Sequence, residues 1–71
     1  MNEAQHIKKI AQNIKRLREE RQLDQVQFAA LCGWDKTSVN RLEAGRTSPN
    51  IKTYLKVASA LEVELSELFK F

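Results

Sequence analysis

The chain contains 71 residues, of which 42% are hydrophobic and 30% are charged, and its formal net charge is +3. This length allows one small domain, and the single cysteine excludes an internal disulfide and fits a reducing compartment. No apolar run is long enough to span a membrane and the first residues lack the order of a signal peptide, so we expect a cytoplasmic protein with no membrane partner.

The charges are unevenly distributed. Residues 36–56 hold five basic residues and one acidic residue, whereas residues 57–71 hold one basic and three acidic residues. A basic middle followed by an acidic tail suits a molecule that faces phosphates at one end. An ordinary mixture of solvated charges is the alternative, and charge alone does not decide between the two.

The first predicted element is a helix of roughly residues 4–20. Its apolar residues recur at the spacing of one helical face: Ile7, Ile10, Ala11, Ile14 and Leu17. We expect this face to pack against the rest of the domain, with residues 21–22 as the connection to the next element.

Two short helices follow, at about residues 25–32 and 36–44. Asp24 can cap the first of them, with Gln27 three residues on as the reciprocal partner of a capping box. Asp35 can cap the second.

Glycines separate and end these two helices. Gly33 supplies a sharp turn between them, and Gly45 supplies a left-handed stop after the second. Two capped helices joined through one glycine predict a helix-turn-helix at about residues 24–44. Such a unit usually lays its second helix in the major groove of DNA.

The last predicted elements are a fourth helix of about residues 51–61, which Asn50 can cap, and a short fifth helix at 65–69. The residues expected to face inward from the fourth helix are Ile51, Tyr54, Leu55, Ala58 and Leu61. No segment shows the two-residue alternation of a strand with a hairpin turn. The predicted fold class is therefore all-α, with five helices.

Residues 23–49 resemble the helix-turn-helix of the lambda-repressor-like family, also called the Cro or XRE type. The shared pattern comprises Leu23, Gln25, Phe28, Ala29, Gly33, Val39, Arg41, Leu42, Glu43, Gly45 and Pro49, and it continues through Tyr54, Leu55, Ala58, Leu61, Glu62, Val63 and Leu68. The likeness runs from about Ile7 to Phe69. It implies a compact five-helix DNA-binding domain covering residues 1–71, in a minimal single-domain regulator.

One position departs from the family pattern. A glycine commonly follows the fourth helix, and this chain has Glu62 there. A residue with a Cβ resists the left-handed conformation by roughly 1–2 kcal/mol. We therefore expect the fourth helix to end in a different way.

Four residues of the third helix are expected to point outward and read bases: Lys36, Thr37, Asn40 and Arg41. Arginine and lysine pair with guanine, asparagine pairs with adenine, and the threonine methyl can touch the thymine methyl. Val39 and Leu42 should face the core. A solvated helix face, or phosphate contacts for the two cations, is the alternative.

Phosphate contacts are expected from Gln25, Ser38, Arg46 and Thr47. Gln25 begins the second helix, where backbone N–H groups attract anions and its amide can donate to a phosphate oxygen. Arg46 and Thr47 lie in the loop that the family uses against the DNA backbone. For Gln25, a first-turn polar residue without a special role is the alternative.

The resemblance also concerns Arg18 and Glu43. In the family, the matching positions form an arginine–glutamate bridge between the first helix and the recognition helix. The resemblance thus implies a structural ion pair that orients the recognition helix. Two independent surface charges are the alternative.

The end of the chain is more apolar than one short docked helix requires. We expect Val63 and Leu68 to fill the core, which leaves Leu65, Phe69 and Phe71 as candidate dimer contacts. The family commonly pairs subunits through this region, so the resemblance implies a homodimer. The alternative is that these side chains complete the core of one subunit.

These features indicate a sequence-specific transcriptional regulator that binds a palindromic operator in double-stranded DNA as a homodimer. The alternatives are a protein-interaction module with the same fold, such as a small antitoxin or antirepressor, and a DNA-binding fragment of a longer protein. The chain has no Ser/His/Asp set, no glycine-rich phosphate loop and no metal-spaced Cys/His cluster. We therefore expect no enzyme activity and no cofactor, metal or small-molecule ligand.

Overall fold

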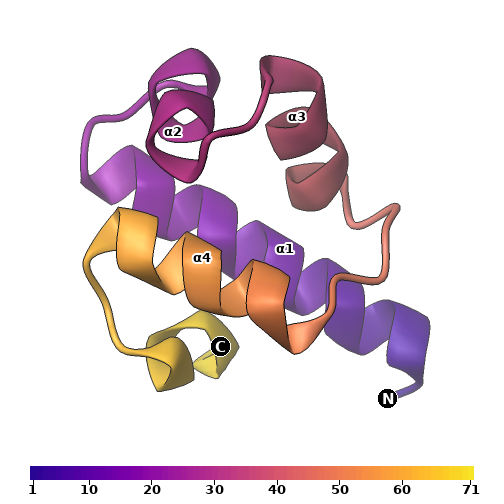
Figure 1. Ribbon diagram of the computed structural model, residues 1–71. Coiled ribbons are helices and arrows are strands. Elements are labelled where there is room, and N and C mark those ends of the chain that lie inside the picture. Colours follow the sequence, from indigo (N-terminus) through magenta and orange to yellow (C-terminus); the bar gives the residue numbers. More distant parts are fainter.

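The computed structural model describes all 71 residues and contains helices but no strand (Figure 1). Its four α-helices are α1 (Glu3–Glu20), α2 (Gln25–Cys32), α3 (Lys36–Ala44) and α4 (Ile51–Leu61). The predicted all-α class and the predicted positions of these four helices are confirmed. None of the helices is both long enough and apolar enough to cross a membrane.

The prediction of a fifth α-helix is wrong. Leu65–Phe69 forms a 3-10 helix, η1, which begins after Glu64 without a side-chain hydrogen bond to its first turn. The Glu67 N–H donates to the Glu64 carbonyl at 2.9 Å, which is the i to i+3 bond of this tighter helix. A segment of five residues without a cap is too short to gain from α-helical bonds, so the domain has four α-helices.

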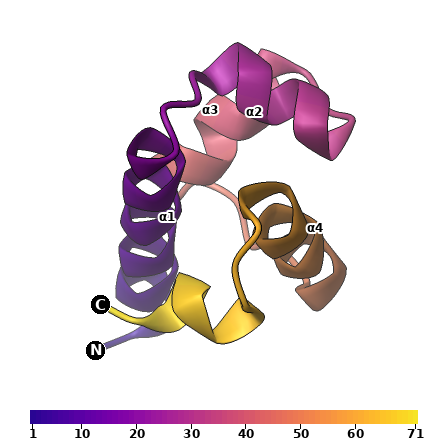
Figure 2. The same cartoon turned by 90° about the vertical axis from the view of Figure 1, so that its left-hand side faces the viewer.

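The helix-turn-helix occupies one end of the molecule. Figure 2 shows α2 and α3 at the top, α1 and α4 on opposite sides beneath them, and η1 at the bottom between α1 and α4. α3 contacts both α1 and α2, while α2 also contacts α4. This arrangement leaves one side of α3 free of neighbouring helices.

Local hydrogen bonds define where the helices begin. All four α-helices start after a residue whose side chain accepts a backbone hydrogen bond: Asn2, Asp24, Asp35 and Asn50. The predicted capping box is present, since Asp24 Oδ1 accepts from the Gln27 N–H at 2.7 Å and Gln27 Oε1 accepts from the Asp24 N–H at 2.9 Å. An equivalent box joins Asn2 and Gln5 at the start of α1, and the sequence reasoning did not identify it.

The expectation that α4 ends differently from the family pattern is wrong. Glu62 adopts the left-handed conformation with φ 57° and ψ 42°, as Gly33 and Gly45 do after α2 and α3. The Val63 N–H donates to the Ala58 carbonyl at 3.0 Å, which closes α4 with a Schellman-type bond. This bond and the packing of Val63 against the core hold Glu62 in a conformation that its Cβ disfavours.

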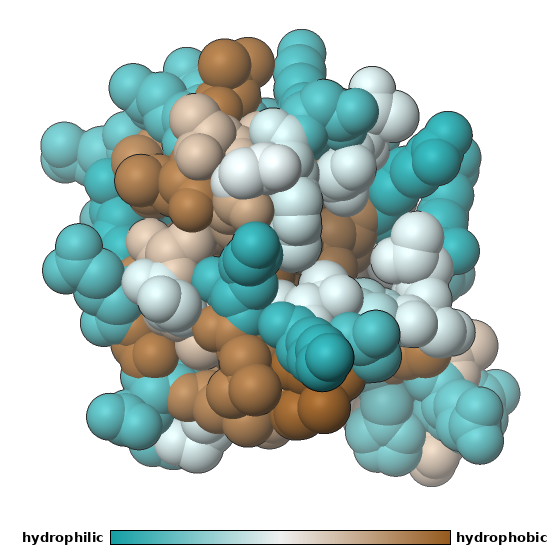
Figure 3. All heavy atoms as spheres, viewed as in Figure 1, coloured by the Kyte–Doolittle hydropathy of each residue, from teal (hydrophilic) through white to brown (hydrophobic).

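The core draws buried apolar side chains from every helix, including Ile14, Phe28, Val39, Leu61 and Leu68. The predicted inward face of α4 is partly wrong. Ile51 and Leu55 are 56% and 50% exposed, whereas Val57, which was not predicted to face inward, is fully buried. α4 packs on α2 and η1 through its other side, and hydrophobic residues consequently gather on the surface over α4 (Figure 3).

A buried polar residue attaches η1 to α1. The Asn13 Nδ2 donates to the carbonyls of Glu67 and Leu68 at 2.8 and 2.9 Å. Its Oδ1 accepts from the Arg16 guanidinium. Because both ends of the amide have partners, Asn13 stays buried without an unsatisfied group and holds the C-terminal turn in place.

Replacing Glu62 by glycine should stabilise the domain, because glycine adopts a positive φ without a Cβ conflict. Relief of about 1–2 kcal/mol of strain is offset by roughly 0.4–1 kcal/mol of added unfolded-state entropy, so we expect a gain of about 1 kcal/mol in the free energy of unfolding. Glu64, with φ −69°, is the matched control. Urea unfolding should show Glu64→Gly to be destabilising; a Glu62→Gly variant less stable than the original chain would contradict the strain argument.

Candidate nucleic-acid interface

The exposed face of α3 carries the four residues predicted to read bases. Lys36, Thr37, Asn40 and Arg41 are all exposed. Val39 and Leu42, on the opposite side of the same helix, are buried in the core. The helical period therefore gathers these four polar side chains on one surface, which we name the α3 face.

The start of α3 is fixed by its cap. Asp35 Oδ1 accepts from the Ser38 N–H at 2.8 Å, and this hydrogen bond lowers the pKa of Asp35 from its ordinary value. Trp34, just before the cap, is half-buried against the core. The turn between α2 and α3 is thus held by packing on one side and by a charged cap on the other.

The residues predicted to contact phosphates fall into two places. Ser38 and Thr47 line one hollow of about 200 Å³ beside α3, together with Trp34, Leu42, Pro49 and Thr53. Gln25 lines another, of about 190 Å³, with Lys15, Asn40, Glu43 and Ala44. Arg46 is exposed in the loop after α3 and lines neither hollow.

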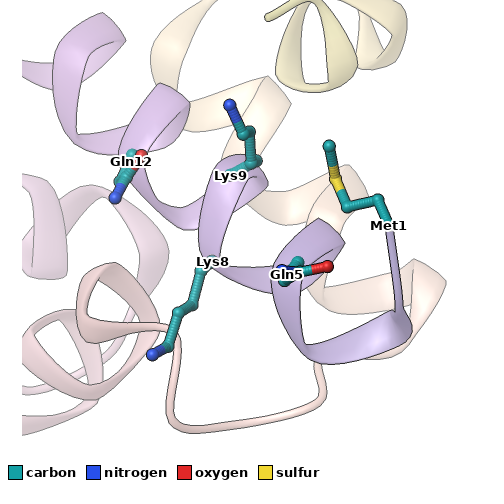
Figure 4. Close-up of a pocket in the computed structure, with 5 residues that line it drawn as sticks. All are labelled: Met1, Gln5, Lys8, Lys9 and Gln12. Atoms are coloured by element: carbon teal, nitrogen blue, oxygen red, sulfur yellow. The ribbon is translucent and has the colours of Figure 1, made fainter.

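The largest hollow holds none of the predicted residues. It measures about 380 Å³, lies along α1, and is lined by Met1, Gln5, Lys8, Lys9 and Gln12 (Figure 4). It is open to solvent and only one of its five lining residues is hydrophobic, so it does not enclose a ligand as a small-molecule site does. Size therefore does not identify the functional surface here.

Arg18 and Glu43 form a buried ion pair between α1 and α3. The Arg18 Nε lies 2.6 Å from Glu43 Oε2 and its Nη2 lies 3.1 Å from Oε1, a two-bond geometry that fits the planar guanidinium. The side chains are only 8% and 3% exposed. The hydrogen bond to Glu43 raises the pKa of Arg18.

The same pair also reaches the second helix. The Arg18 Nη1 donates to the Leu23 carbonyl at 2.6 Å, just before α2. Gln25 Nε2 donates to Glu43 Oε1 at 3.2 Å, so this oxygen accepts from both Arg18 and Gln25. The ion pair therefore connects α1, the start of α2 and the end of α3.

The position of Gln25 is a feature that the sequence reasoning missed. Its amide is half-buried and oriented by Glu43, 18 residues further along the chain. No local pattern in the sequence signals a hydrogen bond over this separation.

Reactive groups are not gathered in the molecule. Cys32 is buried, and burial raises the pKa of its thiol to about 11, so the thiol stays protonated at neutral pH. No group of three or more His, Cys, Asp or Glu residues is arranged to hold a metal ion. The chemistry that this surface offers is hydrogen bonding and positive charge.

The profile of a family described as Helix-turn-helix, HTH_3, matches residues 14–68. Similar solved structures include an HTH_3 family transcriptional regulator from Vibrio cholerae, with 35% identity and a TM-score of 0.89. They also include the restriction-modification controller protein C.AhdI from Aeromonas hydrophila, with 35% identity and a TM-score of 0.85. A third is the hypothetical transcription factor NHTF from Neisseria, with 27% identity and a TM-score of 0.85.

These likenesses cover the present chain almost completely. The three alignments span 96%, 89% and 99% of it, respectively. They span 38% of the Vibrio cholerae chain, 96% of the Aeromonas hydrophila chain and 82% of the Neisseria chain. No curated protein matches the sequence.

Removing one partner of the Arg18–Glu43 pair should destabilise the domain more than removing both. Arg18→Met leaves a buried carboxylate without its cation and should lower the free energy of unfolding by about 3–5 kcal/mol. The double variant Arg18→Met, Glu43→Leu leaves no uncompensated charge and should lose less. Thermal and chemical unfolding measure both.

A control comes from an exposed pair on α1. Arg16 and Glu20 form an ion pair whose side chains are each 53% exposed. Glu20→Leu should change the free energy of unfolding by less than about 1 kcal/mol, because water already solvates both charges. Small additive effects at Arg18 and Glu43 would show that the buried pair does not hold α1 and α3 together.

Proposed function

Because the chain belongs to the HTH_3 helix-turn-helix family, we propose that it is a sequence-specific, DNA-binding transcriptional regulator. We further propose that residues 1–71 act as one DNA-binding domain with its helix-turn-helix at about residues 24–44. The observation that carries the proposal is the α3 face. It is an exposed row of hydrogen-bonding and cationic side chains on a helix whose opposite side is buried in the core. The similarity of the chain to a transcriptional regulator and to a restriction-modification controller supports the same proposal.

In this proposal α3 lies in the major groove of double-stranded DNA. Lys36, Thr37, Asn40 and Arg41 reach base edges, where their donors and acceptors distinguish one base pair from another. A second set contacts the DNA backbone and sets the register without reading sequence: Gln25, Ser38, Arg46 and Thr47. The Arg18–Glu43 pair also holds the Gln25 amide. It would thereby fix the position of this backbone contact relative to the base-reading side chains of α3.

We propose that the regulator binds a palindromic operator as a homodimer. Two recognition helices related by a two-fold axis would then meet successive turns of the major groove, about 34–36 Å apart. The contact surface would lie at the C-terminal end, where Phe69 and Phe71 are 40% and 58% exposed. Leu65 is half-buried against the core, so it would add a smaller part of the contact.

Variants of two predicted contacts should separate base reading from backbone binding. In selections from a randomised duplex library, the original chain should recover an inverted repeat. Arg41→Ala should relax the preference at one position of each half-site by about 1–3 kcal/mol, because a base-edge pair is lost. Gln25→Ala should weaken binding to all sequences alike and keep the consensus, because phosphate contacts carry no base information.

Two outcomes would count against these assignments. If Arg41→Ala retains the original consensus, Arg41 does not read a base. If the folded chain binds no duplex from the library at low salt, the regulator proposal fails, and the protein-interaction alternative becomes the better account of the fold.

The dimer proposal predicts that Phe69→Asp, Phe71→Asp sediments as a monomer at concentrations where the original chain is dimeric, because a charge placed in an apolar contact loses its solvation. Val26 and Leu31 on α2, both 58% exposed, provide the matched control. Val26→Asp, Leu31→Asp should remain dimeric. A tail variant that is folded and still dimeric would move the interface elsewhere, with Ile51 and Leu55 on α4 as the next surface to test.

A further inference from the structure

α1, α2 and α3 meet around a hollow that the proposed contacts only partly explain. It measures about 190 Å³ and is lined by Lys15, Gln25, Asn40, Glu43 and Ala44. Gln25 is a proposed phosphate contact and Asn40 a proposed base reader. Lys15, on α1, lies in the same hollow and has no role in the function proposed above.

The Glu43 carboxylate in this hollow is already paired with Arg18, so it does not compete with an incoming anion for Lys15. Both Glu43 oxygens already accept hydrogen bonds from the Arg18 guanidinium, and one of them also accepts from Gln25. The Glu43 side chain is only 3% exposed. The ion pair is therefore neutral as a unit, and Lys15 is the remaining cation among the lining residues.

Lys15 has no partner within the protein. It belongs to none of the three ion pairs of the molecule and to none of its side-chain hydrogen bonds, and it is exposed. Arg16, its neighbour on α1, is by contrast paired with Glu20 and bonded to Asn13. The free ammonium thus stands beside the two side chains that are proposed to touch the DNA backbone and the base edges.

We propose that Lys15 contacts a phosphate of the DNA backbone at this hollow, so that α1 takes part in binding together with α2 and α3. The inference rests on the proposed regulator function and adds a residue to it. A lysine ammonium is a compact charge that binds phosphate without the fixed geometry of a guanidinium. Beside the neutral Gln25 amide, it would supply the charge that a phosphate diester at this place requires.

The test compares two lysines of the same helix. Lys9 is exposed and unpaired like Lys15, but it lines hollows with Met1 and Lys70 rather than with α2 and α3. Figure 4 shows the Lys9 side chain pointing away from that of Lys8 on the same helix. Lys15→Gln and Lys9→Gln each remove one positive charge, so a difference between their DNA affinities reports the effect of the lysine's position.

Binding of each variant to the selected operator should be titrated over a range of salt concentrations. Lys15→Gln should reduce the slope of log K against log salt by about 0.9 for each bound subunit and weaken binding roughly eightfold per subunit at about 0.1 M salt, with the base preference unchanged. Lys9→Gln should leave the slope at the original value. Lys15→Arg, which keeps the charge, should restore it.

The outcomes distinguish this inference from the function on which it rests. If the original chain binds the operator with a steep salt dependence and Lys15→Gln behaves like Lys9→Gln, the Lys15 contact is refuted and the regulator proposal stands. A changed consensus in Lys15→Gln would also refute it, since the residue would then read a base. If the original chain does not bind DNA at all, it is the proposed function that fails.

Discussion

Arg18 and Glu43 carry opposite charges that folding removes from water, and the rest of the helix-turn-helix depends on their meeting. The pair joins α1 to α3 through two hydrogen bonds, while the third guanidinium nitrogen holds the chain just before α2. A buried pair of this kind contributes little net stability compared with apolar packing, but it tolerates few alternative arrangements. Its consequence is geometric: α3 has a defined orientation relative to α1, which supports it.

The small core alone would define that orientation less sharply. Apolar contacts between α3 and its neighbours involve Val39 and Leu42, and such contacts permit small rotations and shifts of a nine-residue helix. The hydrogen bonds of Glu43 are directional, so they select one of these arrangements. Because Gln25 bonds to the same carboxylate, the start of α2 and the exposed side of α3 are positioned together. The Glu43 carboxylate thereby positions both Gln25, a proposed backbone contact, and the proposed base contacts of α3.

The α3 face and the C-terminal end differ in the chemistry that they expose. The α3 face exposes hydrogen-bonding and cationic side chains, and the hollow beside it that Lys15, Gln25 and Asn40 line is mainly polar. The C-terminal end exposes the Phe69 and Phe71 rings, with Phe69 packed edge-on against Tyr54 at 5.6 Å. Polar groups and charges suit a hydrated phosphate surface, whereas exposed aromatic rings suit an apolar contact. This separation is what a protein needs if it binds a nucleic acid on one side and a second subunit on the other.

Short-range features of the sequence determined the helices. Side-chain caps such as Asp24 and Asp35 bond to groups three residues away, and glycines such as Gly33 adopt a positive φ at no steric cost, so both act within one helical turn. The tertiary structure decided features that depend on distant residues. Packing on α2 and η1 determined which side of α4 is buried, so that Leu55 is exposed and Val57 is buried. The hydrogen bond from the Val63 N–H to the Ala58 carbonyl holds Glu62 in a conformation that its side chain disfavours. The link from Gln25 to Glu43 is of the same kind, because a hydrogen bond between residues far apart in the chain exists only after the core has brought their helices together.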